Sequence, residues 1–329
     1  MEIPKAPELE EQVFSVKNAG EFDQIALQVF NFQYLNNPVY QSFCDLVHRP
    51  PTVISKVGDI PFIPISFFKT SEVKTTTFSP ELVFESSRTT GNTASRHLVK
   101  TAALYERSFT NSFTNVFGSV ENYCILGLLP SYLEQGNSSL VYMVDRLIKL
   151  SNHPSSGFYI KDLAQLNHTL SEQERKKQPT ILFGVTYALL NYAGSYPQPL
   201  KSTIIIETGG MKGRKEEITR AELYQRLKKA FQLKVIHSEY GMTELLSQAY
   251  AADGLYRCPP WMKVLIRDET DPFSYSTSSG GINVIDLANI YSCSFIATED
   301  LGKLHNDGSF EVLGRLDNTD IRGCSLLVS

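Results

Sequence analysis

Four short segments carry residue types suited to binding a nucleotide or its phosphates. The first, Glu85–Thr93, is rich in hydroxyl groups and lies between a predicted strand and a predicted helix. Hydroxyls and backbone amides at such a turn can hold phosphate oxygens beside the positive end of a helix. The chain lacks the pattern GxxxxGK[ST], so this segment is not a P-loop of that kind. A solvated loop is the alternative.

The second segment, Thr208-Gly209-Gly210, directly follows the apolar run Ile204-Ile205-Ile206 and Glu207. Glycines at the carboxyl end of a strand let a flat ligand approach the backbone, as in the crevice of an open α/β sheet. An ordinary tight turn explains the same residues.

The third segment, Tyr240-Gly241-Met242-Thr243-Glu244, follows a predicted strand and leads into a predicted helix through Leu245, Leu246 and Ala249. Tyr240 suits stacking on a base, and Thr243 suits a phosphate oxygen. Glu244 suits Mg²⁺, which prefers hard oxygen ligands. Glu244 is equally typical of the first turn of a helix, where the dipole favours a carboxylate.

The fourth segment combines Thr298–Gly302 with Gly314–Asp317. Asp300 can accept hydrogen bonds from the two hydroxyls of a ribose. Arg315 can bind a phosphate with both arms of its guanidinium, or it can pair with Asp317 at the surface. Between these stretches, Asn306-Asp307-Gly308 predicts a hairpin turn.

Strands alternate with helices over the middle of the chain, which predicts right-handed βαβ units and a largely parallel sheet. The helical region 1–60 is followed by Pro61–Phe68, which we expect to be a buried, extended connection. The α/β core covers 61–256, a β-rich sub-lobe 257–318, and a tail 319–329. The strands are predicted at 82–85, 123–129, 180–185, 202–207, 234–237, 263–266, 281–286 and 309–313. The helices of the core are predicted at 98–116, 139–150 and 219–231, the last with Thr219 and Glu222 as a capping box.

Composition excludes several classes of protein. The 329 residues include 31 basic and 35 acidic side chains, and this net charge of −4 gives no field for nucleic acid. A hydrophobic content of 42% and a charged content of 20% are typical of a globular chain. No run approaches the ~20 apolar residues of a membrane span, and the N-terminus lacks a signal peptide pattern, so we expect a cytoplasmic protein. The five cysteines are scattered and form no CxxC pair, which disfavours disulfides and zinc.

The four segments in this order resemble the adenylate-forming superfamily of acyl-CoA synthetases, luciferase and peptide-synthetase adenylation domains. Three further stretches, Pro61–Thr70, Ser95-Arg96-His97 and Asp320–Leu326, are similar to the bacterial bioluminescence acyl-protein synthetases, the LuxE family of fatty-acid–luciferin-component ligases. The resemblance runs from about Pro61 to the end of the chain. It implies an α/β fold: the large adenylate-forming N-terminal-type domain, with mixed or parallel sheets flanked by helices, a small β-rich lobe and no C-terminal lid domain.

The resemblance also implies a reaction. A carboxylic acid, in this family a fatty acid, is activated with ATP and Mg²⁺ to acyl-AMP, and the acyl group then passes to a cysteine near the C-terminus. Cys324 occupies that position and is the expected nucleophile. A thiolate is a good acceptor for an acyl group on a phosphate leaving group. A partner acyl reductase would receive the acyl group from this thioester.

The resemblance assigns roles to single residues. The pyrophosphate is expected at Ser86, Ser87, Thr89, Thr90 and Gly91. The adenine and the rest of the nucleotide are expected at Thr208, Gly209, Gly210, Tyr240, Gly241, Met242 and Thr243. Glu244 would bind Mg²⁺, Asp300 would hold the ribose, and Arg315 would bind phosphate or act at a hinge.

Two departures from the superfamily pattern matter. Arg88 stands where the phosphate loop usually has glycine, so it strains the turn, binds phosphate directly or weakens ATP binding. The resemblance implies no lid with its catalytic lysine, so we expect the positive charge for the α-phosphate to come from elsewhere. The candidates are Lys69, Arg88, Arg96, His97 and Arg315, and we hypothesise that the tail with Cys324 partly replaces the lid.

Two alternatives stay open. The first is an acyl or aryl-acid ligase that uses CoA or a carrier protein, with Cys324 an incidental packing residue. The second is a non-catalytic homologue that binds nucleotide or acyl ligands without turnover, which Arg88 would explain.

Overall fold

The computed structural model describes residues 6–86, 93–130, 136–209, 218–268, 270–276 and 279–316. Several residues with predicted roles lie outside these ranges. They are Ser87, Arg88, Thr89, Thr90, Gly91, Gly210 and Cys324.

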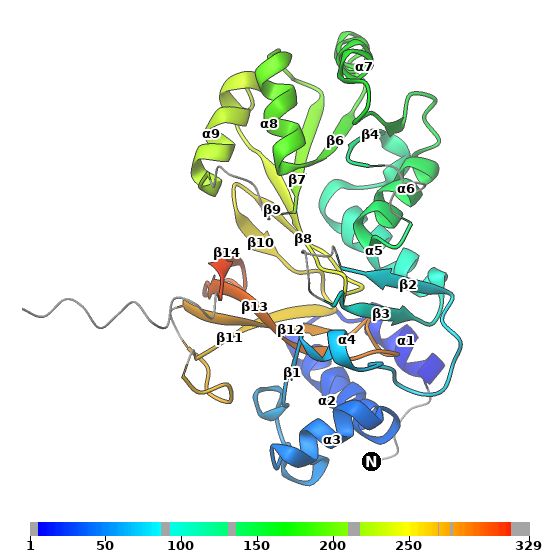
Figure 1. Ribbon diagram of the computed structural model, residues 1–329, viewed down its shortest axis with the longest axis vertical. Helices are drawn as coiled ribbons and strands as arrows, with labels where there is room; N and C mark the ends of the chain where they lie inside the picture. The colour runs from blue at the N-terminus through cyan, green and yellow to red at the C-terminus, as the bar shows by residue number, and fades with distance from the viewer. Residues whose placement is uncertain are drawn as a thin grey trace, which may run out of the picture.

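The described strands form one large mixed sheet and a separate pair (Figure 1). The large sheet has twelve strands in the order β11-β12-β13-β14-β10-β9-β8-β7-β6-β4-β5, with β1 beside β13. Its parallel part consists of β4 (Cys124–Leu128), β5 (Gly157–Phe158), β6 (Thr180–Val185), β7 (Thr203–Thr208) and β8 (His237–Tyr240). The α/β fold and the mixed sheet are confirmed.

The other strands extend this sheet from β8 in antiparallel pairs. They are β9 (Ala249–Ala252), β10 (Leu255–Arg257), β11 (Met262–Arg267), β12 (Ser279–Asp286), β13 (Phe295–Leu304) and β14 (Phe310–Arg315), and β1 (Ile63–Pro64) pairs parallel with β13. The β-rich segment predicted after residue 257 is therefore hydrogen-bonded to the core through Tyr256 and Phe310. The hairpin turn predicted at Asn306-Asp307-Gly308 is confirmed, because it joins β13 to β14 with Gly308 at φ +81°.

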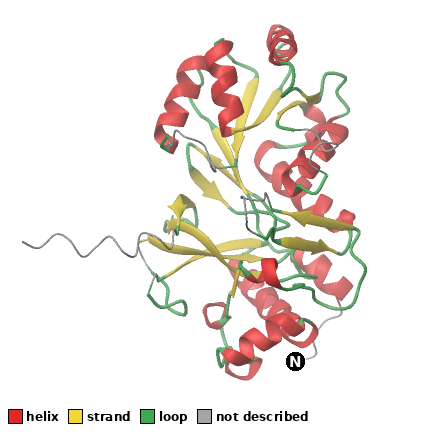
Figure 2. Ribbon diagram, viewed as in Figure 1, coloured by secondary structure: helices red, strands yellow, loops and turns green. Residues whose placement is uncertain are grey.

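Helices cover both faces of the parallel strands (Figure 2). Ile181 and Phe183 of β6 belong to a core shared with α5 (Ala102–Phe117) and α6 (Ser139–Ser151). Leu182, between them, packs in a second core with α7 (Leu163–Lys176), α8 (Thr186–Ser195) and α9 (Arg220–Phe231). Burial on both faces explains why β4 and β6 are almost entirely apolar. The Thr219–Glu222 capping box is confirmed at the start of α9.

The N-terminal helices pack on the antiparallel end of the sheet (Figure 1). They are α1 (Ala6–Phe14), α2 (Ala19–Asn36) and α3 (Pro38–Leu46), followed by the short helices η1 (Pro51–Val53) and η2 (Val57–Asp59). Gln33 of α2 is fully buried and donates hydrogen bonds to the carbonyl oxygens of Asn289 and Ile290. This contact ties α2 to the segment that follows β12.

Two helix predictions are wrong, one in its first residue and one entirely, because strand pairing replaces helix formation in both places. The helix predicted from residue 98 begins at Ala102, since β3 (Arg96–Val99) pairs with β2 (Leu82–Glu85). The helix predicted after Glu244 is replaced by a turn and by β9, which pairs with β8. The strand predicted at 234–237 lies later, at His237–Tyr240.

The stretch Pro61–Phe68 is extended only in part. It contains β1, and the helix α4 (Phe67–Thr70) begins within it. Elsewhere in the chain, the short helix η3 (Val120–Asn122) lies between α5 and β4. In the described parts of the chain, no helix has both the length and the apolarity needed to cross a bilayer. The cytoplasmic location stays a prediction.

Candidate functional site

The site is built at the carboxyl ends of β7 and β8, which are adjacent and parallel. Gly209 ends β7 at φ +72°, a backbone conformation that glycine adopts without strain, and the space where its Cβ would lie is open. Gly241 follows β8, and a Cβ there would lie 2.5 Å from Oε1 of Glu239. Both positions therefore require glycine, Gly209 for its backbone and Gly241 for its close neighbour.

Three residues predicted to bind the nucleotide come together beside these glycines. The Tyr240 hydroxyl donates a hydrogen bond of 2.9 Å to Oδ2 of Asp300, and Nε of Arg315 lies 3.6 Å from Oδ1 of the same carboxylate. Asp300 and Arg315 face each other across β13 and β14. Their side chains are 17% and 51% exposed, so polar groups at this edge of the sheet remain open to a ligand.

The Tyr240 ring is fixed by its surroundings. It packs edge-on against Tyr256 and Phe310, with ring centroids 5.8 and 5.6 Å away. Burial, together with the nearby Asp300 carboxylate, raises the pKa of the Tyr240 phenol well above its usual value. The hydroxyl therefore stays protonated and donates to Asp300.

A buried aspartate anchors the segment after Tyr240. Asp286, at the end of β12, accepts hydrogen bonds from the backbone amides of Leu246 (2.8 Å) and Ser247 (3.0 Å) and from the Ser247 hydroxyl. Trp261 donates to the same hydroxyl at 2.9 Å. These bonds fix the backbone between the turn at Thr243-Glu244 and β9. Asp286 was not predicted from the sequence, because a single aspartate at the end of a strand forms no spacing pattern with other residues that would indicate this role.

His97 is a positioning residue in this structure. Its Nδ1 lies 2.8 Å from the carbonyl oxygen of Thr243 and its Nε2 lies 3.0 Å from Oδ1 of Asn289. The ring is 1% exposed, and burial lowers its pKa to about 4, although the contacts with Thr243 and Asn289 both act to raise it. A neutral ring carries one N–H and donates to only one of these two oxygens. It cannot supply the positive charge expected of it, because desolvation opposes its protonation. It joins β3 to the third predicted segment instead.

Asn289 completes this link and was also missed. Its Nδ2 donates to the carbonyl oxygens of Glu244 (2.8 Å) and Cys293 (3.0 Å), while its Oδ1 faces His97. The backbone of Thr243 and Glu244 is thus held from two sides by His97 and Asn289. An isolated asparagine in a turn carries no sequence signal for this role.

Glu244, the predicted Mg²⁺ ligand, is 4% exposed. In the described ranges, no three His, Cys, Asp or Glu side chains gather into a metal site. Mg²⁺ commonly takes one or two carboxylates and completes its shell with phosphate oxygens and water. A single carboxylate here fits that pattern. Met242, beside it, packs against the core.

Two serines, Ser86 and Ser95, are hydrogen-bonded to each other near the two ends of the predicted phosphate-binding segment Glu85–Thr93. The backbone amide and the hydroxyl of Ser95 both donate to Oγ of Ser86 at 3.0 Å, and the Ser86 amide donates to the Ser95 carbonyl. Ser86 therefore fixes the base of the segment.

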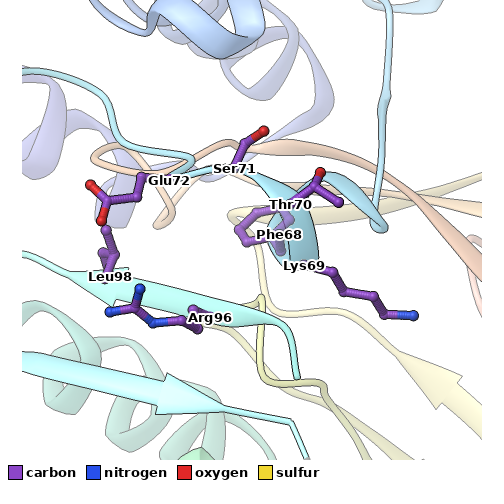
Figure 3. A pocket seen from close by; sticks show the side chains of 7 residues that line it. All are labelled: Phe68, Lys69, Thr70, Ser71, Glu72, Arg96 and Leu98. Atoms are coloured by element: carbon purple, nitrogen blue, oxygen red, sulfur yellow. The ribbon is translucent and has the colours of Figure 1, made fainter. Parts of the chain in front are cut away.

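Two of the cation candidates line a hollow between α4 and β3, with a volume of 150 Å³ (Figure 3). Its walls are Phe68, Lys69, Thr70, Ser71, Glu72, Arg96 and Leu98. Arg96 and Glu72 extend on the same side, whereas Lys69 points away from both (Figure 3). Arg96 begins β3 and is the register partner of Glu85 on β2, next to the segment Glu85–Thr93. Arg96 therefore stays a candidate for phosphate binding.

Two buried glutamates, also missed, lie beside Thr208: Glu207 precedes it on β7, and Glu239 is its register partner on β8. Glu207 accepts hydrogen bonds from Thr186 and Ser238 on the face covered by α8 and α9. Glu239 lies on the opposite face and accepts a hydrogen bond from the Thr208 hydroxyl. Burial raises the pKa of both carboxyls, that of Glu239 to about 7. Thr208, expected to bind nucleotide, thus directs its hydroxyl to Glu239.

Solved structures with this fold include three kinds of enzyme. ATP-bound MatB from Rhodopseudomonas palustris is 16% identical, with a TM-score of 0.54 over 73% of this chain and 49% of that chain. The O-succinylbenzoate coenzyme A synthetase MenE from Bacillus subtilis, in complex with AMP, is 18% identical, with a TM-score of 0.51 over 72% and 49%. 2-Hydroxyisobutyryl-CoA ligase in its postadenylation state is 12% identical, with a TM-score of 0.62 over 96% and 72%.

The fold is that of the large N-terminal domain of adenylate-forming enzymes. The chain matches only about half the length of the MatB and MenE structures. The acyl-protein synthetase (LuxE) family model matches residues 14–329, so the chain belongs to that family. No curated protein matches the chain.

Proposed function

We propose that this protein is an ATP-dependent acyl-protein synthetase that activates a carboxylic acid, of the fatty-acid class, and stores the acyl group on Cys324. The observation that carries the proposal is the meeting of Tyr240, Asp300 and Arg315 at the carboxyl ends of β7 and β8. Membership of the acyl-protein synthetase family supports acyl transfer as the overall reaction. Family and fold together support an acyl-adenylate-forming ligase.

The first step joins the acid to the nucleotide. A carboxylate oxygen of the acid attacks the α-phosphorus of ATP, a new oxygen–phosphorus bond forms, and pyrophosphate leaves. Asp300 would hold the ribose, and Arg315 would face phosphate charge, so this chain contributes mainly orientation and charge. Mg²⁺ held by Glu244 would neutralise phosphate charge. ATP in the MatB structure and AMP in the MenE structure support a nucleotide in this fold.

The second step moves the acyl group to sulfur. The Cys324 thiolate attacks the acyl carbonyl, a thioester forms, and AMP leaves with the bonding electrons; the thiol proton has already gone to solvent. The thioester retains enough reactivity for transfer to a partner acyl reductase.

A second candidate, a ligase that passes the acyl group to CoA, is favoured by the MenE and 2-hydroxyisobutyryl-CoA ligase matches. It predicts acid-dependent turnover that needs CoA and survives Cys324→Ala.

Intact-mass analysis of the full chain tests the proposal directly. With Mg-ATP and an accepted acid, the mass should rise by one acyl group, and hydroxylamine should remove the adduct. Cys324→Ala should abolish the adduct and retain pyrophosphate release. Cys258→Ala is the matched control, because Cys258 is partly buried and burial raises its pKa to about 12. An adduct that survives Cys324→Ala contradicts the thioester, and CoA-dependent turnover in that variant supports the second candidate.

A further inference from the structure

Three polar side-chain atoms of α5, β9 and the residue before β9 are buried without a hydrogen-bond partner in the described structure. They are Oε1 of Gln248, the hydroxyl of Tyr250 and Oγ of Ser112. The three residues are only 4%, 3% and 2% exposed. Three such orphans in one region are costly, since a buried polar atom without a partner forfeits its bonds to water.

Gln248 and Tyr250 lie on the face of the sheet that carries Glu239, whereas Ser112 belongs to helix α5. Tyr250 is the register partner of Glu239 across β8 and β9, so both side chains stand on the same face. Gln248 and Glu239 both lie against Gly241, with Cγ of Gln248 3.5 Å and Oε1 of Glu239 2.5 Å from the point where a Cβ would be. We call Glu239, Gln248, Tyr250 and Ser112 the polar cluster.

Helix α5 packs against the segment that carries Ser247 and Tyr250. The Ser108 hydroxyl lies 3.0 Å from that of Ser247, and the Phe117 ring packs against Tyr250 with centroids 5.2 Å apart. Ser112 lies between these two contacts, on the same buried face of α5. The polar cluster is therefore placed between α5 and the sheet, next to the residue that follows Tyr240.

The chemistry of the polar cluster is that of neutral donors and acceptors. Among the described residues, the Glu239 carboxyl is flanked by tyrosine, glutamine and threonine rather than by a cation, and its hydrogen bond comes from Thr208. Gln248 Oε1 is an acceptor, whereas the hydroxyls of Tyr250 and Ser112 can donate or accept. A saturated hydrocarbon chain satisfies none of these atoms. A hydroxyl group, which donates once and accepts twice, satisfies up to three.

We propose that the acid activated by this protein carries a hydroxyl group close to its carboxylate, and that the polar cluster binds this hydroxyl. The inference rests on the proposed function, because it assumes that an acid is activated beside Tyr240. It deepens that function by naming the substrate class: a hydroxylated acid, rather than a plain alkanoic acid of the same length. An ammonium group in place of the hydroxyl would be buried with only one carboxyl to compensate it, so an amino acid is disfavoured.

Acid-dependent pyrophosphate release by the full chain tests the inference, with octanoate, 3-hydroxyoctanoate and 3-aminooctanoate as probes. We expect kcat/KM for 3-hydroxyoctanoate to exceed that for octanoate at least about tenfold, since a site built for a hydroxyl leaves its groups unpaired without one. Equal or higher kcat/KM for octanoate, or a preference for the amino acid, overturns the inference and leaves the proposed function intact. Absence of pyrophosphate release with any carboxylic acid overturns the proposed function itself.

Tyr250→Phe separates substrate binding from folding. The hydroxyl makes no internal hydrogen bond, so its removal should raise the melting temperature of the unliganded protein. The same variant should lose most of the preference for 3-hydroxyoctanoate over octanoate, and 3-hydroxyoctanoate should no longer protect it better than octanoate in a thermal-shift measurement with Mg-ATP.

Tyr123→Phe is the matched control. The Tyr123 hydroxyl donates to the carbonyl oxygen of Phe117 at 2.6 Å, so this variant should lose stability and keep the preference. An unchanged preference in Tyr250→Phe contradicts the inference, whatever its melting temperature.

Discussion

The hydroxyl of Tyr240 donates a hydrogen bond of 2.9 Å to the Asp300 carboxylate, and so links the end of β8 to β13. The two residues come from separate predicted segments, which the sheet brings together through β9, β10 and β14. Asp300 thereby has one oxygen oriented by Tyr240 and the other facing Arg315. A ribose bound at this carboxylate would meet an acceptor that is already fixed in position.

Tyr240→Phe should weaken ATP binding. The change removes only the hydroxyl, so Asp300 loses the donor that orients it. We expect KM for ATP to rise several-fold and the free energy of unfolding to fall by about 1.5–3 kcal/mol, the usual value for a hydrogen bond to a charged group. Pyrophosphate release and urea unfolding measure the two effects. Tyr159→Phe, which removes a 2.7 Å bond to Ser155 away from the site, should affect stability alone.

Arg315→Ala should separate nucleotide binding from stability. The Arg315–Asp300 pair is 3.6 Å long and Arg315 is 51% exposed, so its loss should cost less than about 1 kcal/mol of stability. KM for ATP should nevertheless rise at least tenfold, because a cation facing phosphate is lost. Arg257→Ala breaks a comparable surface pair with Asp307 and is the control. An equal change in KM for both variants would show that Arg315 has no specific role.

His97 should make the protein sensitive to acid. Burial holds its pKa at about 4 in the folded chain, below the ordinary value of 6.5. The unfolded chain therefore takes up a proton first, and stability should decline from pH 6.5 downward by about 3 kcal/mol, a loss that is complete only below pH 4. Urea unfolding of His97→Gln between pH 4 and 7 should lack this part of the pH dependence. The exposed His168, replaced in the same way, should retain it.

Glu239 should act in the opposite direction. Its folded-state pKa of about 7 lies above the ordinary 4.5, so the folded chain keeps a proton that the unfolded chain has lost. Its contribution to stability is complete below pH 4.5 and is lost as the pH rises through 7. Relative to Glu239→Gln, the unmodified protein should thus lose about 3 kcal/mol between pH 4.5 and pH 8. A pH-independent difference between the two would contradict a buried carboxyl that titrates near 7. Glu172→Gln, at an exposed position, is the control.

The described cysteines illustrate why the tail thiol is the preferred nucleophile. Burial raises the pKa values of Cys44, Cys124 and Cys258, to about 12, 11 and 12. Cys293, also buried, has a raised pKa as well. Thiols with such values hold little thiolate at neutral pH and react slowly. Alkylation with iodoacetamide at pH 7.5 should therefore label Cys324 well before these four. Faster labelling of any of the four would contradict their burial.

The sequence by itself determined the features that depend on neighbours along the chain. The apolar runs of β6 and β7, the Thr219–Glu222 cap and the turn at Gly308 each follow from local propensity. Each of the four segments alone is also typical of an ordinary loop or turn, but their order indicated the adenylate-forming superfamily, and three further stretches indicated the LuxE family. Tertiary structure alone decided the rest. β3 and β9 are strands because other strands pair with them. Asn289 and His97 hold the Tyr240–Glu244 segment, and Asp286 holds the residues that follow it, through contacts that no spacing records. Whether Glu239 carries a charge likewise depends on burial, which arises only when α5 packs on the sheet.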